Sequence, residues 1–177
     1  MTLQLTTNQV WEAIEKESFA VVGMVTAKSE ARTIGITYVV RDRKLYFGTF
    51  IKMWKVRHIT ANPHVSLTVA IDRRILLLPW INIPAATITF SGRARVLETG
   101  EVPPDLLQAV FSNKDVDEQF IAASCVIEVT PEKDFITYGV GITRLQMRDP
   151  NKSRARVPVN GKSPTSQNVE RHGMETP

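Results

Sequence analysis

Cationic and hydroxyl side chains between residues 49 and 55 have the composition of an anion site. Thr49 ends an apolar run that we interpret as a strand, Lys52 lies in the short turn that follows, and Lys55 falls in the first turn of a segment with helical spacing. A helix N-terminus presents amide N–H groups without intrahelical partners and the positive end of a dipole. Together with a hydroxyl and two ammonium groups, this arrangement predicts a phosphate site.

Several motifs of common enzyme classes are missing from the chain. It contains no Gly-x-Gly-x-x-Gly, no phosphate loop ending in Gly-Lys-Ser/Thr and no Gly-x-Ser-x-Gly, which argues against nucleotide hydrolases and serine hydrolases. His58, His64 and His172 lack metal-site spacing, and the single Cys125 excludes a thiolate-only zinc site. We therefore expect no metal and name no catalytic residue.

Period-2 and period-3.6 patterns place these residues in a mainly β, α+β chain. The alternation at residues 65–71 is the clearest strand signal, and Thr6 with Gln9 forms a capping box. We predict helices over 7–17, 51–61 and from Pro103 to about Ala123, and strands over 19–26, 32–40, 44–49, 65–71, 85–98, 125–130 and 135–138. So many short strands with three helices favour a β-barrel over a doubly wound parallel sheet.

Composition indicates one folded domain with a tail. The chain has 177 residues, 43% of them hydrophobic and 23% charged, and a net charge of +4. Residues 151–177 hold five basic and two acidic residues, which leaves the rest nearly neutral. We predict a domain over 1–148 and a flexible basic tail over 149–177, and consider nucleic acid an unlikely partner. No apolar run is long enough to span a membrane, so we expect a soluble, cytoplasmic protein.

An apolar connection between two strands suggests a covered surface. Residues 75–84 contain seven large apolar side chains and two prolines. Because exposing so much apolar area is unfavourable, we expect a cover over this segment, most simply a second copy of the chain, otherwise a lid over a bound group.

The order of these elements resembles a known superfamily. A hairpin is followed by a strand ending in Thr, a Lys-containing turn, a helix, the strand Asn-Pro-x-Val-Ser-Leu and the segment 90–96, Phe-Ser-Gly-Arg-Ala-Arg-Val. This is similar to the FMN-binding split-barrel superfamily of pyridoxamine 5'-phosphate oxidase-like proteins, over about residues 8–148. The resemblance implies a six-stranded antiparallel split β-barrel with short flanking helices, and a homodimer with two flavin sites at the subunit interface.

The resemblance also implies where the cofactor lies. It places the flavin ring along the backbone of 36–38, the phosphate on Thr49 and Lys55, and Thr87 of the partner near the flavin, with Tyr138 or Thr137 at a position where relatives present an aromatic side chain. Relatives often have Ser or Thr and then Arg where this chain has Met53 and Trp54, so Lys52 would replace the missing cation. The implied cofactor-binding residues are Ile36, Thr37, Tyr38, Thr49, Lys52, Met53, Lys55, Thr87 and Tyr138.

The function that follows from the resemblance is an FMN-dependent oxidoreductase acting on a small molecule. The basic residues that bind pyridoxal phosphate in the true oxidase are not matched, so vitamin B6 oxidation does not follow. Three alternatives stay open: a deazaflavin-dependent reductase, a non-enzymatic module that binds flavin or haem, and a DNA-associated protein that uses the basic tail. The substrate and electron donor are not readable from the sequence.

Overall fold

The computed structural model describes residues 5–71, 86–111, 117–142, 147, 149 and 153–161. The helices are α1 (Thr7–Glu15), α2 (Trp54–Ala61), α3 (Pro104–Phe111) and α4 (Glu118–Ala123), with a 3-10 turn η1 at Thr99–Glu101. The strands are β1 (Phe19–Val25), β2 (Ala31–Thr37), β3 (Val39–Arg41), β4 (Lys44–Phe50), β5 (His64–Ile71), β6 (Ala86–Glu98), β7 (Ser124–Tyr138) and β8 (Arg154–Pro158). No helix in these ranges is long and apolar enough to cross a membrane. The apolar segment 75–84 lies outside the described residues.

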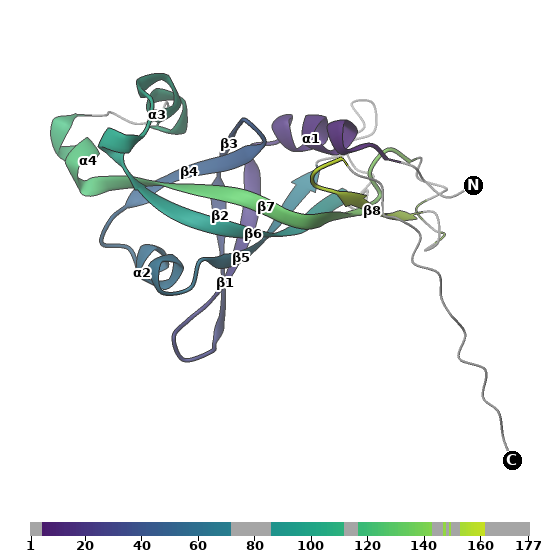
Figure 1. The fold of residues 1–177 in the computed structure, drawn as a ribbon, viewed down its shortest axis with the longest axis horizontal. Helices are drawn as coiled ribbons and strands as arrows, with labels where there is room; N and C mark the ends of the chain where they lie inside the picture. The colour runs from purple at the N-terminus through teal and green to yellow at the C-terminus, as the bar shows by residue number, and fades with distance from the viewer. Residues whose placement is uncertain are drawn as a thin grey trace, which may run out of the picture.

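The strands form one antiparallel sheet that closes on itself. Their order is β2-β1-β5-β6-β7-β4-β3, and β8 adds to β7. Only Tyr38 separates β2, which pairs with β1, from β3, which pairs with β4. Counted as one bent strand, β2 and β3 therefore join the two ends of the path, and six strands enclose the core. This confirms the split β-barrel expected from the sequence (Figure 1). The path has seven strands instead of the expected six, because the strand predicted over 32–40 is divided at Tyr38, and β8 pairs with β7 beside this path.

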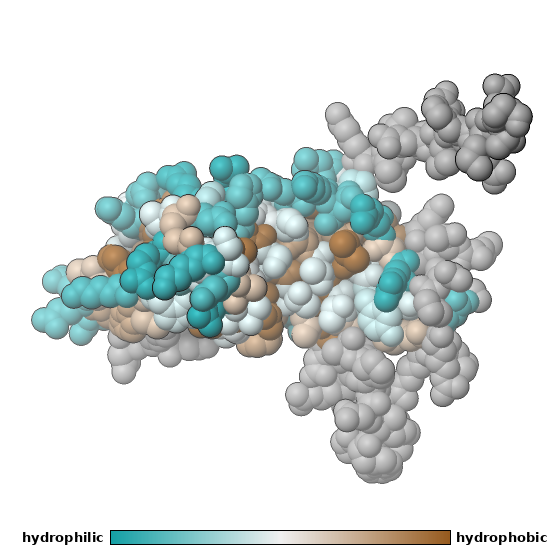
Figure 2. Space-filling view, turned by 90° about the horizontal axis from the view of Figure 1, so that it is seen from below, coloured by the Kyte–Doolittle hydropathy of each residue, from teal (hydrophilic) through white to brown (hydrophobic). Residues whose placement is uncertain are grey.

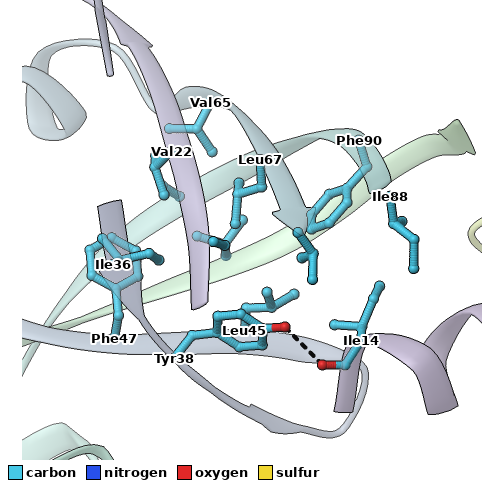
Figure 3. Close-up of a cluster of buried hydrophobic side chains, with 14 of the residues drawn as sticks. Ile14, Val22, Ile36, Tyr38, Leu45, Phe47, Val65, Leu67, Ile88 and Phe90 are labelled. Atoms are coloured by element: carbon cyan, nitrogen blue, oxygen red, sulfur yellow. Dashed lines mark hydrogen bonds between the residues drawn. The ribbon is translucent and has the colours of Figure 1, made fainter. Parts of the chain in front are cut away.

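The barrel interior is filled by aromatic and branched side chains. Phe47, Phe90 and Phe135 are at most 2% exposed, and Phe135 makes edge-to-face contacts with Phe90 at 5.3 Å and with Trp11 at 5.4 Å between ring centroids. Trp11 comes from α1, whose predicted capping box at Thr6 is present. Tyr38 points inward and its hydroxyl donates to the Ile14 carbonyl at 2.8 Å, which ties the barrel wall to α1 (Figure 3).

A smaller apolar cluster lies outside the barrel, where α3 and α4 cover β4 and β7 at one end of the long strands (Figure 1). Where we predicted one helix from Pro103 to Ala123, the structure has two. α4 begins separately because the Asp117 carboxylate accepts from the Phe120 amide at 2.6 Å, an N-cap that starts a new helix. Likewise, the two predicted strands at 125–130 and 135–138 are one strand, β7, whose pairing with β6 shifts register between Thr89 and Ser91.

Part of the predicted flexible tail belongs to the sheet, so the prediction is wrong for residues 154–158. β8 pairs with β7 from Asp134↔Pro158 to Tyr138↔Arg154. Val157 and Val159 are buried in the main core, and the Thr7 hydroxyl donates to the Pro158 carbonyl at 2.8 Å. This segment is ordered despite its polar composition, because two of its valines are buried and because β7 offers a strand edge with which it pairs.

Gly48 permits the close packing of α3 on β4, and replacing it should destabilise the fold. A Cβ built at Gly48 would lie 2.2 Å from Cε1 of Phe111, so the helix would have to move. We expect Gly48→Ala to lower the free energy of unfolding by about 1–3 kcal/mol, the usual cost of overpacking. The matched control is Gly100→Ala, because a Cβ there meets no heavy atom within 4 Å. Urea denaturation of both variants tests this, and equal stabilities would contradict it.

Candidate functional site

The structure brings Thr49 and Lys55 together, as predicted. Thr49 is the last buried residue of β4, and the turn after it is held by the Ile51 amide donating to the Ala123 carbonyl at 2.9 Å and the Met53 amide donating to the Phe50 carbonyl at 3.1 Å. This turn starts α2 beside the strand end, and Lys55 Nζ donates to Thr49 Oγ1 at 3.1 Å. A hydroxyl and an ammonium group thus meet at the start of a helix.

The N-terminus of α2 has no side-chain cap. Its N-cap residue is Met53, no side chain bonds to the cap position, and no acidic residue occupies the first turn. Most helix N-termini are capped by Ser, Thr, Asp or Asn, and acidic residues are stabilising there. A helix start that instead carries Lys55 is arranged for an external anion.

Cys125 lies beside this pair, but its thiol does not compete with an external anion for Lys55. It is directly opposite Thr49 in the β4–β7 register and is 1% exposed. Burial raises the pKa of the Cys125 thiol, and the Lys55 charge lowers it by less. The thiol therefore stays protonated at neutral pH and is not an anionic partner of Lys55.

The other predicted phosphate residues lie in the turn and at the helix start. Lys52 is exposed and Met53 is 38% exposed, so both border the site from solvent. Trp54 is half-buried, packs against the main core and contacts the His58 ring at 5.7 Å between centroids. Trp54 is thus a packing residue of α2.

Of the three predicted ring-contact residues, which lie at the end of β2 and just after it, only Thr37 turns its backbone toward the open edge. The Tyr38 amide donates to the Ser18 carbonyl at 3.0 Å, and Ile36 is paired with Ala20 of β1. Because antiparallel strands alternate the direction of their N–H and C=O groups, the backbone groups of Thr37 point away from β1. The side chains of Ile36 and Tyr38 are buried in the core. Of the three residues predicted to contact the flavin ring through their backbone, only Thr37 therefore has backbone groups that point away from β1.

Thr87 and Tyr138 are also brought together, at a different place. They are directly opposite each other in the β6–β7 register, and both are half-buried. The alternative residue, Thr137, is fully buried and its hydroxyl donates to the Ala155 carbonyl at 3.4 Å. Tyr138 is therefore the one of the two that faces outward.

The two pairs lie far apart in a single chain. Thr49 is opposite Cys125, which is opposite Glu98 at the far end of β6 from Thr87. Thr87 and Glu98 are eleven positions apart on β6, a distance on the order of 30 Å along the strand. No flavin mononucleotide is that long. Within one chain, therefore, these four residues cannot contact the same cofactor molecule.

The outer face of the sheet, meaning the side chains of β2, β1, β5, β6 and the end of β7 that point away from the core, carries one charged side chain, Glu132, in three adjacent rows and is otherwise uncharged there. The rows are Thr33, Gly23, Ser66, Ser91 and Glu132; Gly35, Val21, Thr68, Thr89 and Ile136; and Thr37, Phe19, Ala70, Thr87 and Tyr138. Phe19 is 49% exposed and Ile136 is 48% exposed. A sheet face in water normally carries charged side chains, so this face has the character of a buried surface.

A groove of about 530 Å³ crosses this outer face over the small residues Gly23, Ser66 and Ser91, with His64 and Lys133 among its lining residues. The groove depends on Gly23, because a Cβ there would lie 2.6 Å from the Ser66 hydroxyl. The molecular surface is also uneven in polarity: in the view of Figure 2, neutral and apolar atoms spread across the middle, and hydrophilic atoms gather along the upper edge.

A second hollow, of about 450 Å³, lies on the other side of the barrel beside α3. Its charges are matched internally: Arg95 pairs with Glu101 at 3.1 Å, and Glu128 accepts from Lys44 and from the Tyr46 hydroxyl at 3.1 and 3.0 Å. Arg41, which also lines this hollow, pairs with Asp105 at 2.6 Å, so each of the basic side chains in its lining already has an acidic partner.

Two tyrosines should make the fold sensitive to alkaline pH. Burial, then the charge of Glu17, raises the pKa of Tyr38, and burial with the hydrogen bond to Glu128 raises the pKa of Tyr46 to about 12. The folded state keeps these protons after the unfolded phenols ionise near pH ~10, so stability should fall as pH rises above ~10. We expect thermal denaturation to show this fall and Tyr46→Phe to make it shallower. In Tyr138→Phe, phenolate absorbance appearing in the folded protein near pH ~10 would contradict the shifts.

Solved structures with the same fold bind different cofactors. A haem-binding protein from Mycobacterium smegmatis aligns with a TM-score of 0.64 and 10% identity, over 91% of this chain and 61% of that one. An FAD-binding protein from Mesorhizobium loti aligns with a TM-score of 0.54 and 14% identity, over 73% and 90%. A haem storage protein from Vibrio cholerae aligns with a TM-score of 0.54 and 13% identity, over 80% and 98%. At these identities the likeness concerns the fold.

A comparison with curated proteins finds no match. The family model described as pyridoxamine 5'-phosphate oxidase, in contrast, matches residues 6–136, from the cap of α1 to the end of the barrel in β7. This range includes Thr49, Lys55 and Thr87 and ends before β8. The chain therefore belongs to the pyridoxamine 5'-phosphate oxidase family.

Proposed function

We propose that the protein is a homodimeric oxidoreductase that binds FMN between its two copies and acts on a small molecule. The observation that carries this proposal is the contact of Lys55 with Thr49 at the uncapped start of α2. An ammonium group, a hydroxyl and a helix dipole form a fitting cradle for a phosphate monoester, which is the charged end of FMN.

The dimer is supported by the separation of the two residue pairs. Thr87 and Tyr138 lie on the order of 30 Å of strand from Thr49 and Lys55, so they meet one cofactor only if they come from the partner. The almost uncharged outer face supports the same arrangement, because it includes Thr87, Tyr138 and the exposed Phe19 and is suited to burial against a second copy.

Within this proposal the protein residues bind and orient, and the cofactor supplies the redox chemistry. Bound FMN would provide two-electron transfer between a donor and an acceptor. Lys55 and Thr49 would hold the phosphate, the backbone of Thr37 would hydrogen-bond at the open edge of β2, and Tyr138 of the second copy would limit access of water. Among the residues that the structure describes, we assign no catalytic acid or base to this site.

Haem binding is a second candidate, favoured by His64. Its imidazole borders the groove over Gly23, and histidine is a common axial ligand of haem. The names of two structural neighbours agree with this candidate. A deazaflavin is an alternative within the first proposal, because Lys52 and Arg57 could pair with its acidic tail.

The absorption spectrum of the purified protein separates these possibilities. FMN, deazaflavin and haem have different visible spectra, and mass spectrometry of the heat-released molecule identifies which one is bound. Apoprotein should also take up added FMN, with a dimer mass by light scattering. A monomer that binds none of the three cofactors would refute the proposal. A haem spectrum lost in His64→Ala but kept in His58→Ala would favour the second candidate.

A further inference from the structure

The hollow of about 450 Å³ beside α3 combines an apolar wall with charged side chains. Its wall is formed by Leu97 of β6, Leu106 of α3, and Val102 and Pro103 between η1 and α3. A volume of this size is typical of small-molecule sites, which are mostly apolar and carry a few polar groups at fixed positions. The lining residues include none of those assigned to FMN and none of the three rows of the outer face. A ligand here would therefore not compete with the cofactor.

Glu128 lines this hollow with only one of its two carboxylate oxygens occupied. It lies opposite Tyr46 of β4 on one side and opposite Arg95 of β6 on the other. Its Oε2 accepts from Lys44 Nζ at 3.1 Å and from the Tyr46 hydroxyl at 3.0 Å, while Arg95 pairs with Glu101 instead. Its Oε1 accepts no hydrogen bond from any residue that the structure describes. An acceptor oxygen without a donor thus belongs to a side chain that is only 16% exposed.

Asp42 brings to the hollow an acid that has no basic partner within the described part of the chain. Arg41 pairs with Asp105 at 2.6 Å, and Arg43 donates to Asn8 Oδ1 at 2.7 Å. The lining residues and their ion-pair partners contain four acidic and three basic side chains, which are Asp42, Glu101, Asp105 and Glu128 against Arg41, Lys44 and Arg95. Pairing therefore leaves one negative charge over.

The turn between β3 and β4 holds Asp42 in place through an unfavourable backbone conformation. Asp42 and Arg43 have φ angles of 50° and 57°, in the left-handed region that favours glycine and asparagine. This two-residue turn closes the hairpin beyond the pair Arg41↔Lys44. Burial, then the bond to Glu128 and the charges of Glu128 and Asp42, raise the pKa of Tyr46 to about 12. The charge of Asp42 therefore acts on the inside of the hollow.

We propose that this hollow binds an aliphatic primary amine, with its ammonium group at Glu128 Oε1, attracted by Asp42, and its carbon chain along the apolar wall. An ammonium group offers three donors, and the two carboxylates supply acceptors that lack them. An anionic ligand would meet excess negative charge and find the bases already paired. A metal ion fits less well, because the described residues contain no group of three His, Cys, Asp or Glu side chains able to hold one.

Calorimetric titration of the full-length protein with n-hexylamine and with 1-hexanol tests this proposal. The two probes share a carbon chain and differ in charge, so we expect hexylamine to bind about 10-fold or more tightly at neutral pH. Added sodium chloride should reduce the preference, because salt screens the attraction between the charges. Magnesium chloride at matched ionic strength should have no further effect.

Glu128→Gln should remove the preference for the amine. Because Glu128 also accepts from Lys44 and Tyr46, a second variant, Asp42→Asn, tests the charge without touching this network. Asparagine tolerates a positive φ, so the turn should be kept while the affinity for hexylamine falls several-fold. The control, Glu30→Gln, removes an exposed acid from the turn between β1 and β2, which projects below the barrel in Figure 1, whereas α3 lies above it. It should keep the preference.

Three outcomes would overturn the proposal. They are equal binding of the two probes, a preference that survives in both Glu128→Gln and Asp42→Asn, and an equal loss in Glu30→Gln. Displacement of hexylamine by magnesium chloride beyond the effect of matched sodium chloride would assign the hollow to an inorganic cation and would overturn it as well. Urea denaturation of each variant shows that the comparison is made between folded proteins.

Discussion

Replacing Lys55 with alanine is expected to weaken FMN binding about 10- to 100-fold, the usual effect of removing a hydrogen bond to a charged group. The reason is that Lys55 Nζ lies 3.1 Å from Thr49 Oγ1 and supplies the positive charge at the start of α2. Fluorescence titration of apoprotein with FMN measures the dissociation constant. Riboflavin, which lacks the phosphate, should bind the variant and the unmodified protein equally well.

Arg57→Ala is the control for this prediction, because Arg57 is an exposed cation on the same helix, two residues farther from its start. Its removal changes net charge by the same amount and should change FMN affinity little. Equal losses in the two variants would indicate general electrostatic attraction, and unchanged affinity in Lys55→Ala would rule out the phosphate cradle.

A lysine in place of Val21 is expected to separate the two copies and release the flavin. Val21 is 37% exposed in the single chain and lies in the row between Gly35 and Thr68, at the middle of the outer face. In the dimer two unpaired charges would be buried, at a cost of several kcal/mol, so the dissociation constant of the dimer should rise about 100-fold or more. Light scattering after gel filtration reports the mass, and visible absorbance reports the bound flavin.

The control is Gln108→Lys, a charge of the same sign at an exposed position of α3 on a different part of the surface. It should remain a dimer with bound FMN. A second variant on the same row, Thr89→Lys, should behave like Val21→Lys, and circular dichroism should show that both keep their strands. A dimer of Val21→Lys that retains its flavin would mean that the outer face is not the interface.

The sequence was sufficient to predict the barrel and the Thr49–Lys55 pair because both depend on local patterns. Period-2 alternation between turn residues sets the strands, and a strand end followed by a short turn and a helix start brings residues six apart together. The cap at Asp117, which divides the predicted third helix, was also readable in principle, but an apolar helical spacing on both sides concealed it.

The features that could not be predicted depend on long-range pairing. Arg154–Pro158 has few apolar residues, and it is ordered by hydrogen bonding to β7 and by burial of Val157. The almost uncharged outer face is encoded in alternate positions of five strands, but rows appear only when the register between strands is known. A single strand with one polar side and no charge is unremarkable in a sequence; several such strands side by side make a surface.

The bond from the Thr7 hydroxyl to the Pro158 carbonyl joins residues 151 positions apart and has a consequence for biosynthesis. Until β8 has been synthesised, the edge of β7 that β8 covers is unpaired and Phe135 lacks the neighbouring Val157. The nascent chain therefore cannot finish this core before residues 154–159 have emerged from the ribosome. A chaperone that shields this open edge during translation would raise the yield of native protein, and a stalled or prematurely ended chain would be a ready substrate for proteolysis.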